Sequence, residues 1–213
     1  MPTIKSIIIF NGGSCGDFLQ AVCLEQIYQQ STHVLYNNNS TIQVKNQYFK
    51  HFCGDTYHKN TTDKLDFSKT FPVENSHYYL DFFADSNSQL FYIDYPDSAQ
   101  GLITQCYLEK RMSNSVEKFY NEHIKHIPQT LQHKIDPLNI VNAFDVQNKK
   151  NLTLWRHNPQ MRSIPISSLF DIELLIPVVE TVCQQPLANV DMLQTTQTQW
   201  VNANPALNNF FKP

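Results

Sequence analysis

The residues best placed to do chemistry form a glycine-rich turn near the amino terminus. The apolar run Ile7–Phe10 leads into Asn11-Gly12-Gly13-Ser14-Cys15-Gly16-Asp17, which holds three of the chain's five glycines. Such a turn lets several backbone N–H groups point towards one place, and the start of a helix favours an anion there. The spacing predicts a phosphate- or sulfate-binding turn made of Gly12, Gly13, Ser14, Cys15, Gly16 and Asp17.

A structural interpretation of the same turn stays open beside this one. Ser14 and Asp17 stand at the spacing of a capping box, in which the hydroxyl accepts from the third helical N–H and the carboxylate reaches back. The Asp17 carboxylate would then lie where an anion would bind. Cys15, beside the helix start, is a less favoured candidate for a nucleophilic thiol.

The turn departs from the Walker A pattern, which needs four residues between its glycines and then Lys and Ser or Thr. Gly12 and Gly16 are one residue too close, and Asp17 stands at the lysine position. The sequence therefore argues against ATP or GTP hydrolysis and against a small-molecule kinase. Asp94, at the end of an apolar run, is a weak candidate for a magnesium ligand and fits a solvated strand end better.

The elements that position this turn follow from hydrophobic periodicity. Short β-branched or aromatic runs predict extended segments at 4–10, 33–36, 77–80, 89–94, 152–155 and 163–166. Helical spacing predicts helices at 17–29, from 98 to about 126, at 169–183 with an interruption or new start at Pro177, and at 190–202. We expect loop with short helices over 41–75 and leave 138–144 ambiguous.

Alternation of strands and helices predicts an α/β fold: three layers, α/β/α, around a mainly parallel sheet. The length of 213 residues and the 41% of apolar residues are sufficient for one domain over 1–213 with a real core. We expect its tail to be loose from about residue 203, and Trp155 and Trp200 to lie in the core.

Composition limits the classes of partner and compartment. The net charge of −3 argues against nucleic-acid binding, and no apolar run is long enough to span a membrane. Five cysteines without a CxxC pair fit a reducing compartment and no disulfide framework. We therefore expect a cytoplasmic protein, or one exported without a cleaved signal peptide. His51 and His58 lack partners at metal-ligand spacing, so no metal is expected.

Four stretches in order along the chain resemble the sulfotransferase-like branch of the P-loop (phosphate-loop) nucleoside triphosphate hydrolase fold. None of them is specific alone. They are the strand and glycine turn up to Phe18-Leu19, Phe91-Tyr92-Ile93-Asp94-Tyr95-Pro96-Asp97-Ser98, Ile164-Pro165-Ile166-Ser167-Ser168-Leu169-Phe170-Asp171 and Gln199-Trp200-Val201-Asn202-Ala203-Asn204-Pro205.

The resemblance implies transfer of a sulfuryl group from 3′-phosphoadenosine 5′-phosphosulfate to a hydroxyl or amine of a small-molecule or protein acceptor. It implies a turn that holds the 5′-phosphate, no metal, and a histidine base, for which His77 is the candidate. The chain departs from the family pattern where Asp94 stands in place of an arginine and Leu102 in place of a serine. Arg156 and Arg162 are the candidates to replace the lost cationic contacts. The alternative is a non-catalytic protein that keeps this scaffold and acts as a protein-interaction module.

Overall fold

A four-stranded parallel sheet forms the centre of the computed structural model, which describes residues 6–29, 34–36, 42–44, 73–76, 88–112 and 137–212. Its strands are β4 (Val73–Ser76), β1 (Ser6–Ile9), β5 (Gln89–Asp94) and β6 (Met161–Pro165), in that spatial order. Every neighbouring pair is parallel. Strands β2 (Val34–Tyr36) and β3 (Ile42–Val44) pair antiparallel in a separate small sheet. The predicted α/β class with a parallel sheet is confirmed.

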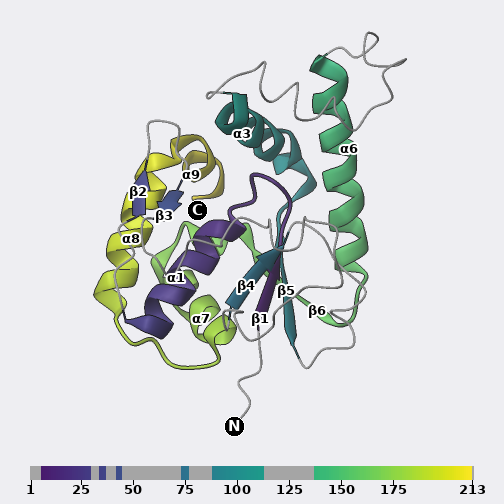
Figure 1. The fold of residues 1–213 in the computed structure, drawn as a ribbon. Coiled ribbons are helices and arrows are strands. Elements are labelled where there is room, and N and C mark those ends of the chain that lie inside the picture. Colours follow the sequence, from purple (N-terminus) through teal and green to yellow (C-terminus); the bar gives the residue numbers. More distant parts are fainter. Residues whose placement is uncertain are drawn as a thin grey trace, which may run out of the picture.

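Helices surround this sheet. Their bounds are α1 Gly16–Tyr28, α3 Gln100–Met112, α6 Pro137–Arg156, α7 Ile172–Cys183, α8 Val190–Ala203 and α9 Pro205–Phe211. Short 3-10 turns precede α3 at Asp97–Ala99 and α7 at Ile166–Leu169. In Figure 1, α1, α7 and α8 lie together on one side of β1, and α6 lies on the other. Among the described residues, no helix is both long and apolar enough to cross a membrane.

The order of the strands places the glycine turn where the winding of the sheet reverses direction. From β1 the chain reaches β4 on one side of β1, and then crosses to β5 on the other side. Such a reversal of winding leaves a crevice outside the carboxyl ends of the two diverging strands, where open α/β sheets bind ligands. The turn leaves β1 at this edge, and it is therefore the part of the sheet where a ligand site is expected.

Strand β1 lies in the core, and this accounts for its unbroken run of apolar residues. Ile7, Ile8 and Ile9 are all buried, as expected for a strand covered on both faces. Trp200 of α8 stacks on Phe18 of α1, with ring centroids 4.0 Å apart. Trp155 and Trp200 are both buried, as predicted.

Two elements correct our expectations from sequence. The range 152–155 is not a strand but the last turns of α6, because Leu152 and Trp155 are buried at helical spacing while Leu154 between them is exposed. The tail is not loose where it forms α9, which begins at Pro205 and buries Leu207 and Phe211.

Other boundaries differ in smaller ways. Pro177 lies inside α7 without ending it, because the buried Leu175, Val179 and Val182 hold both halves against the core. The ambiguous range 138–144 is part of α6, and the helix expected from 98 is described as far as Met112. The range 41–75 contributes β3 and the start of β4, whereas the strand expected at 77–80 lies outside the described residues.

Candidate functional site at the carboxyl edge of the sheet

The glycine turn closes on the carbonyl oxygen of Asn11. The Ser14 amide donates to it at 3.0 Å and the Ser14 hydroxyl donates to it at 2.8 Å. Helix α1 then begins at Gly16, with Cys15 at the N-cap in the left-handed region (φ 68°) and no side-chain cap. The capping box, one of the two interpretations left open by the sequence, is therefore wrong, because the Ser14 hydroxyl bonds back into the turn. Asp17 lies exposed in the first helical turn.

At each glycine of the turn, a side chain would clash with a neighbouring group. A Cβ on Gly12 would lie 2.8 Å from the Tyr107 ring, and one on Gly13 would lie closer still to the Ile103 carbonyl oxygen. A Cβ on Gly16 would overlap the Phe10 ring. Tyr107 and Ile103 belong to α3, so this helix packs directly on the turn. Close packing is therefore sufficient to account for the local excess of glycine.

A chain of polar side chains, buried at its centre and partly exposed at its two ends, lies at the carboxyl ends of β1 and β5. Each group donates to the next, which aligns the dipoles and strengthens the individual bonds. In order, Asn151 Nδ2 donates to Asn11 Oδ1 (3.3 Å), Asn11 Nδ2 to the Tyr95 hydroxyl (2.8 Å), the Tyr95 hydroxyl to Gln100 Oε1 (3.1 Å), Gln100 Nε2 to Thr104 Oγ1 (3.3 Å) and Thr104 Oγ1 to Asp145 Oδ1 (3.0 Å). This polar chain ties both strand ends to α3 and α6.

Asn11 is the centre of the polar chain, since its amide also donates to the Asn148 carbonyl at 2.9 Å. The side-chain nitrogen of Asn148 is buried and has no hydrogen-bond partner among the residues that the structure describes. Sequence analysis missed these residues because their types are common. The sequence feature that could have identified Asn11 and Tyr95 is that each follows a buried strand. The carboxyl ends of these two strands lie where the winding of the sheet reverses.

Arg156, one of the two predicted cofactor cations, is held by carboxylates at the end of β5. Its Nε lies 2.9 Å from Asp94 Oδ1, its Nη1 lies 2.9 Å from Asp97 Oδ1, and its Nη2 donates to the Tyr95 carbonyl oxygen at 2.6 Å. The arginine side chain is 32% exposed and that of Asp94 is 29% exposed, so this pair is partly shielded from water. Asp97 is 71% exposed and contributes less. We call this group the Arg156 clamp.

The other predicted site residues lie apart from the turn or outside the described residues. Arg162 contacts Gln89 at 3.5 Å, and Gln89 is in register with Ser6, the first residue of β1. Arg162 is therefore at the amino edge of the sheet, opposite the glycine turn. His77 lies outside the described residues. Within the described ranges, no group of three or more His, Cys, Asp or Glu residues is placed to hold a metal ion.

The buried phenol of Tyr95 should make the stability of the protein depend on pH in the alkaline range. Burial raises the pKa of Tyr95 from 10 to about 12. The unfolded chain releases this proton near pH 10, so the stability that the neutral phenol contributes is complete below pH 10 and is lost between pH 10 and about 12. Relative to Tyr95→Phe, we expect the unfolding free energy of the native protein to fall by about 1.4 kcal/mol per pH unit in this window.

Urea unfolding of both proteins across this window measures the difference. The other tyrosines titrate in both proteins and cancel, and the slopes are compared rather than the absolute stabilities. Equal slopes for the native protein and Tyr95→Phe would contradict a buried phenol.

Comparison with known proteins finds no protein-family model, curated protein or solved structure that matches this chain. The features of this chain that bear on function are the glycine turn, the polar chain and the Arg156 clamp. The sulfotransferase-like resemblance stays a prediction from sequence.

Proposed function

We propose that this protein is a non-catalytic binding module, built on a three-layer phosphate-loop scaffold of the sulfotransferase-like type whose donor-nucleotide site is closed by its own side chains. The Arg156 clamp carries this proposal. The resemblance would place the 3′-phosphate of the donor at the end of β5, and there Arg156 is bound to Asp94 and Asp97.

A phosphate at that point would have to displace carboxylates from the guanidinium. Each charge-assisted hydrogen bond contributes roughly 1.5–3 kcal/mol, less where it is exposed. The phosphate would then face the same Asp94 and Asp97 carboxylates at close range, which repel it. Both effects lower the affinity for an adenosine bisphosphate.

The packing of α3 supports the same conclusion at the glycine turn. The Ile103 carbonyl oxygen lies against Gly13, and the Tyr107 ring lies against Gly12. A carbonyl dipole with its negative end towards the turn disfavours an anion beside it. The polar chain meanwhile satisfies Asn11 and Tyr95 internally.

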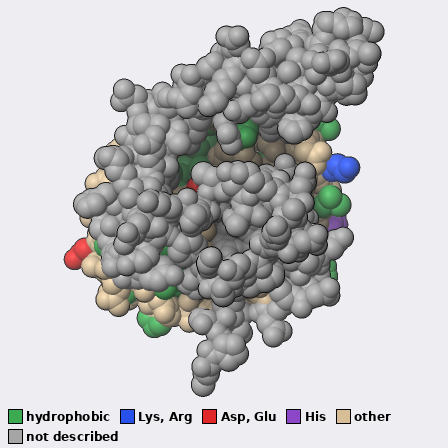
Figure 2. Space-filling model, viewed as in Figure 1, with side chains coloured by type: hydrophobic (Ala, Val, Ile, Leu, Met, Phe, Trp, Pro, Cys, Tyr) green, Lys and Arg blue, Asp and Glu red, His purple; other side chains and the backbone are tan. Residues whose placement is uncertain are grey.

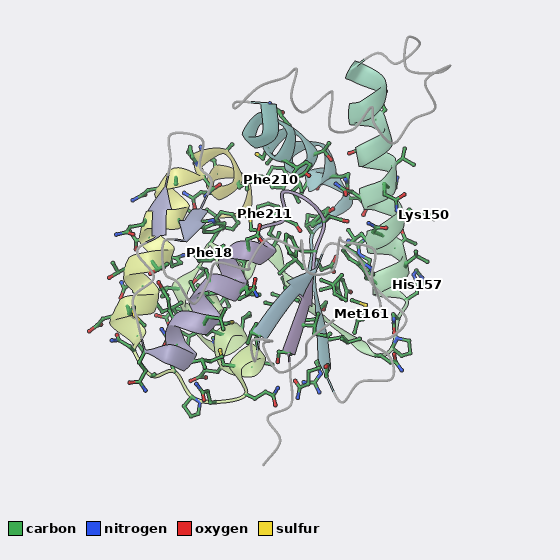
Figure 3. The ribbon with its side chains drawn as sticks, in the orientation of Figure 1. Phe18, Lys150, His157, Met161, Phe210 and Phe211 are labelled. Carbon is green, nitrogen blue, oxygen red and sulfur yellow. The ribbon has the colours of Figure 1, made fainter. Side chains whose placement is uncertain are left out.

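The outer side of α6 is the surface that best fits a partner in this proposal. Val146 and Leu154 are 67% and 59% exposed, and Lys150, midway between them at helical spacing, is also exposed. Figure 2 shows hydrophobic, cationic and histidine side chains along this edge, and Figure 3 shows Lys150 and His157 on the outer side of the helix. This mixture fits a protein surface that carries apolar and acidic groups.

A second candidate, an active sulfotransferase, is favoured by one observation. The amides of Gly12, Gly13 and Gly16 make no hydrogen bond among the described residues. Three such donors at a helix start suit the 5′-phosphate of 3′-phosphoadenosine 5′-phosphosulfate. His77 would then be tested as the base.

Thermal unfolding with adenosine 3′,5′-bisphosphate distinguishes the two candidates. The binding-module proposal predicts no change in Tm at millimolar ligand. A working donor site at 100 times the dissociation constant would stabilise the fold by roughly 2.7 kcal/mol, which raises Tm on the order of 5–10 °C. Adenosine and sodium sulfate at matched ionic strength are the controls. A dose-dependent rise with the bisphosphate alone would overturn the binding-module proposal.

A further inference from the structure

Two cysteines that lie far apart in the sequence meet between α1 and α7. Cys23, in α1, is fully buried, whereas Cys183, the last residue of α7, is partly exposed. The Cys183 thiol donates to the Cys23 carbonyl oxygen at 3.5 Å, which places the Cys183 sulfur directly beside Cys23. Both are free thiols.

The end of α7 is fixed in place beside this pair. The Ser6 hydroxyl donates to the Val182 carbonyl oxygen at 2.6 Å, and Gln184 Nε2 donates to the Ser6 hydroxyl at 3.2 Å. These bonds join the residues on both sides of Cys183 to the first residue of β1. The backbone at Cys183 is thus held in place beside Cys23.

We propose that Cys183 and Cys23 form a dithiol that a hydroperoxide oxidises to an intramolecular disulfide. In the first step the Cys183 thiolate attacks the distal peroxide oxygen; the O–O bond breaks, the thiolate becomes a sulfenic acid, and water or an alcohol leaves with the proton. In the second step the Cys23 sulfur attacks the sulfenic sulfur, the S–S bond forms and water leaves. Two thiols and one peroxide give one disulfide, and the two electrons go to the peroxide oxygens.

The surroundings assign the order of the two thiols. The partly exposed Cys183 can meet a peroxide, whereas Cys23 is closed to solvent. Burial raises the pKa of the Cys23 thiol well above its usual range, which keeps it protonated and slow towards peroxide. Cys23 is therefore the resolving thiol, and contact with Cys183 compensates for its low reactivity. This inference does not depend on the proposed function.

The disulfide would change the stability of the whole fold. It would link residues 160 positions apart in the sequence, and closing so long a loop strongly restricts the unfolded chain. We expect Tm to rise on the order of 10 °C after oxidation and to return when dithiothreitol is added.

Mass spectrometry of the full chain after treatment with hydrogen peroxide tests the proposal. We expect a loss of about 2 Da, and a peptide map in which Cys23 and Cys183 are joined. Cys183→Ser should show neither change, whereas Cys106→Ser, the matched change at another partly exposed cysteine, should behave like the native protein.

Cys23→Ser provides an independent arm, since Cys183 should then stop at the sulfenic acid and be trapped by dimedone. Far-ultraviolet circular dichroism shows whether each variant is folded. A cross-link between other cysteines, or irreversible oxidation of Cys183 without a link to Cys23, would overturn the proposal.

Discussion

Replacing Gly13 by alanine is expected to destabilise the fold by about 3 kcal/mol or more. Gly13 has φ 89°, where an L-residue carries a strain of roughly 1–2 kcal/mol. The added Cβ would also overlap the Ile103 carbonyl oxygen, which belongs to the backbone of α3 and cannot rotate away. Such overpacking typically adds about 1–3 kcal/mol. Equilibrium unfolding in urea measures the sum.

The same chain offers a matched control of opposite sign. Gly101 lies exposed in α3, and a Cβ there would meet nothing within 4 Å. Gly101→Ala should therefore stabilise the protein by about 0.5–1 kcal/mol through helix propensity. If Gly13→Ala remained within about 0.5 kcal/mol of the native protein, α3 would not pack on the turn as described.

Trp200→Ala is expected to have the largest effect of a core substitution, about 3–5 kcal/mol of lost stability. The indole is buried and stacks on Phe18 at 4.0 Å, and it also contacts Phe170 with ring centroids 4.8 Å apart. Phe18 lies in the first turn of α1, directly after the glycine turn, so the stack also anchors the start of that helix. The volume lost cannot be refilled by neighbours held in a close-packed core.

Phe210→Ala is the control for this change. Phe210 is 45% exposed and contacts Phe211 edge-on, so its removal should cost less than about 1.5 kcal/mol. Urea unfolding of both variants gives the comparison. Similar losses for Trp200→Ala and Phe210→Ala would show that the stack does not hold α1.

Local patterns were sufficient to predict β1, α1 and β5, because each has an unbroken apolar run or helical spacing within its own residues. The strand predicted at Leu152-Thr153-Leu154-Trp155 was wrong because it also rested on a local pattern alone. Four apolar-rich residues fit a strand, and only the burial of Asn148, Leu152 and Trp155 along one face identifies them as helix. The loose-tail prediction failed because composition does not reveal that Leu207 and Phe211 find places in the core.

The site was harder to predict because its contacts join distant parts of the chain. The sequence draws attention to the glycine turn, but its packing cause lies in Tyr107 and Ile103, about ninety residues away. Arg156 was selected for its charge, and no local signal indicates that Asp94 and Asp97 hold it. Asn11 and Tyr95 were not selected from the sequence. Open α/β sheets bind ligands beside the strand ends where the winding reverses, and this rule, applied to the predicted strand ends, would have selected both.

We predict that the carboxyl edge of the sheet does not accept an adenosine bisphosphate, because Asp94 and Asp97 hold Arg156 there. The most direct measurement follows the ¹H–¹⁵N amide signals of Gly12, Gly13 and Gly16 during the titration with adenosine 3′,5′-bisphosphate. We predict that these signals stay in place to millimolar ligand, as they do with adenosine. Saturable shifts of the three glycine amides, together with a rise in Tm, would contradict the claim and favour a working sulfotransferase site.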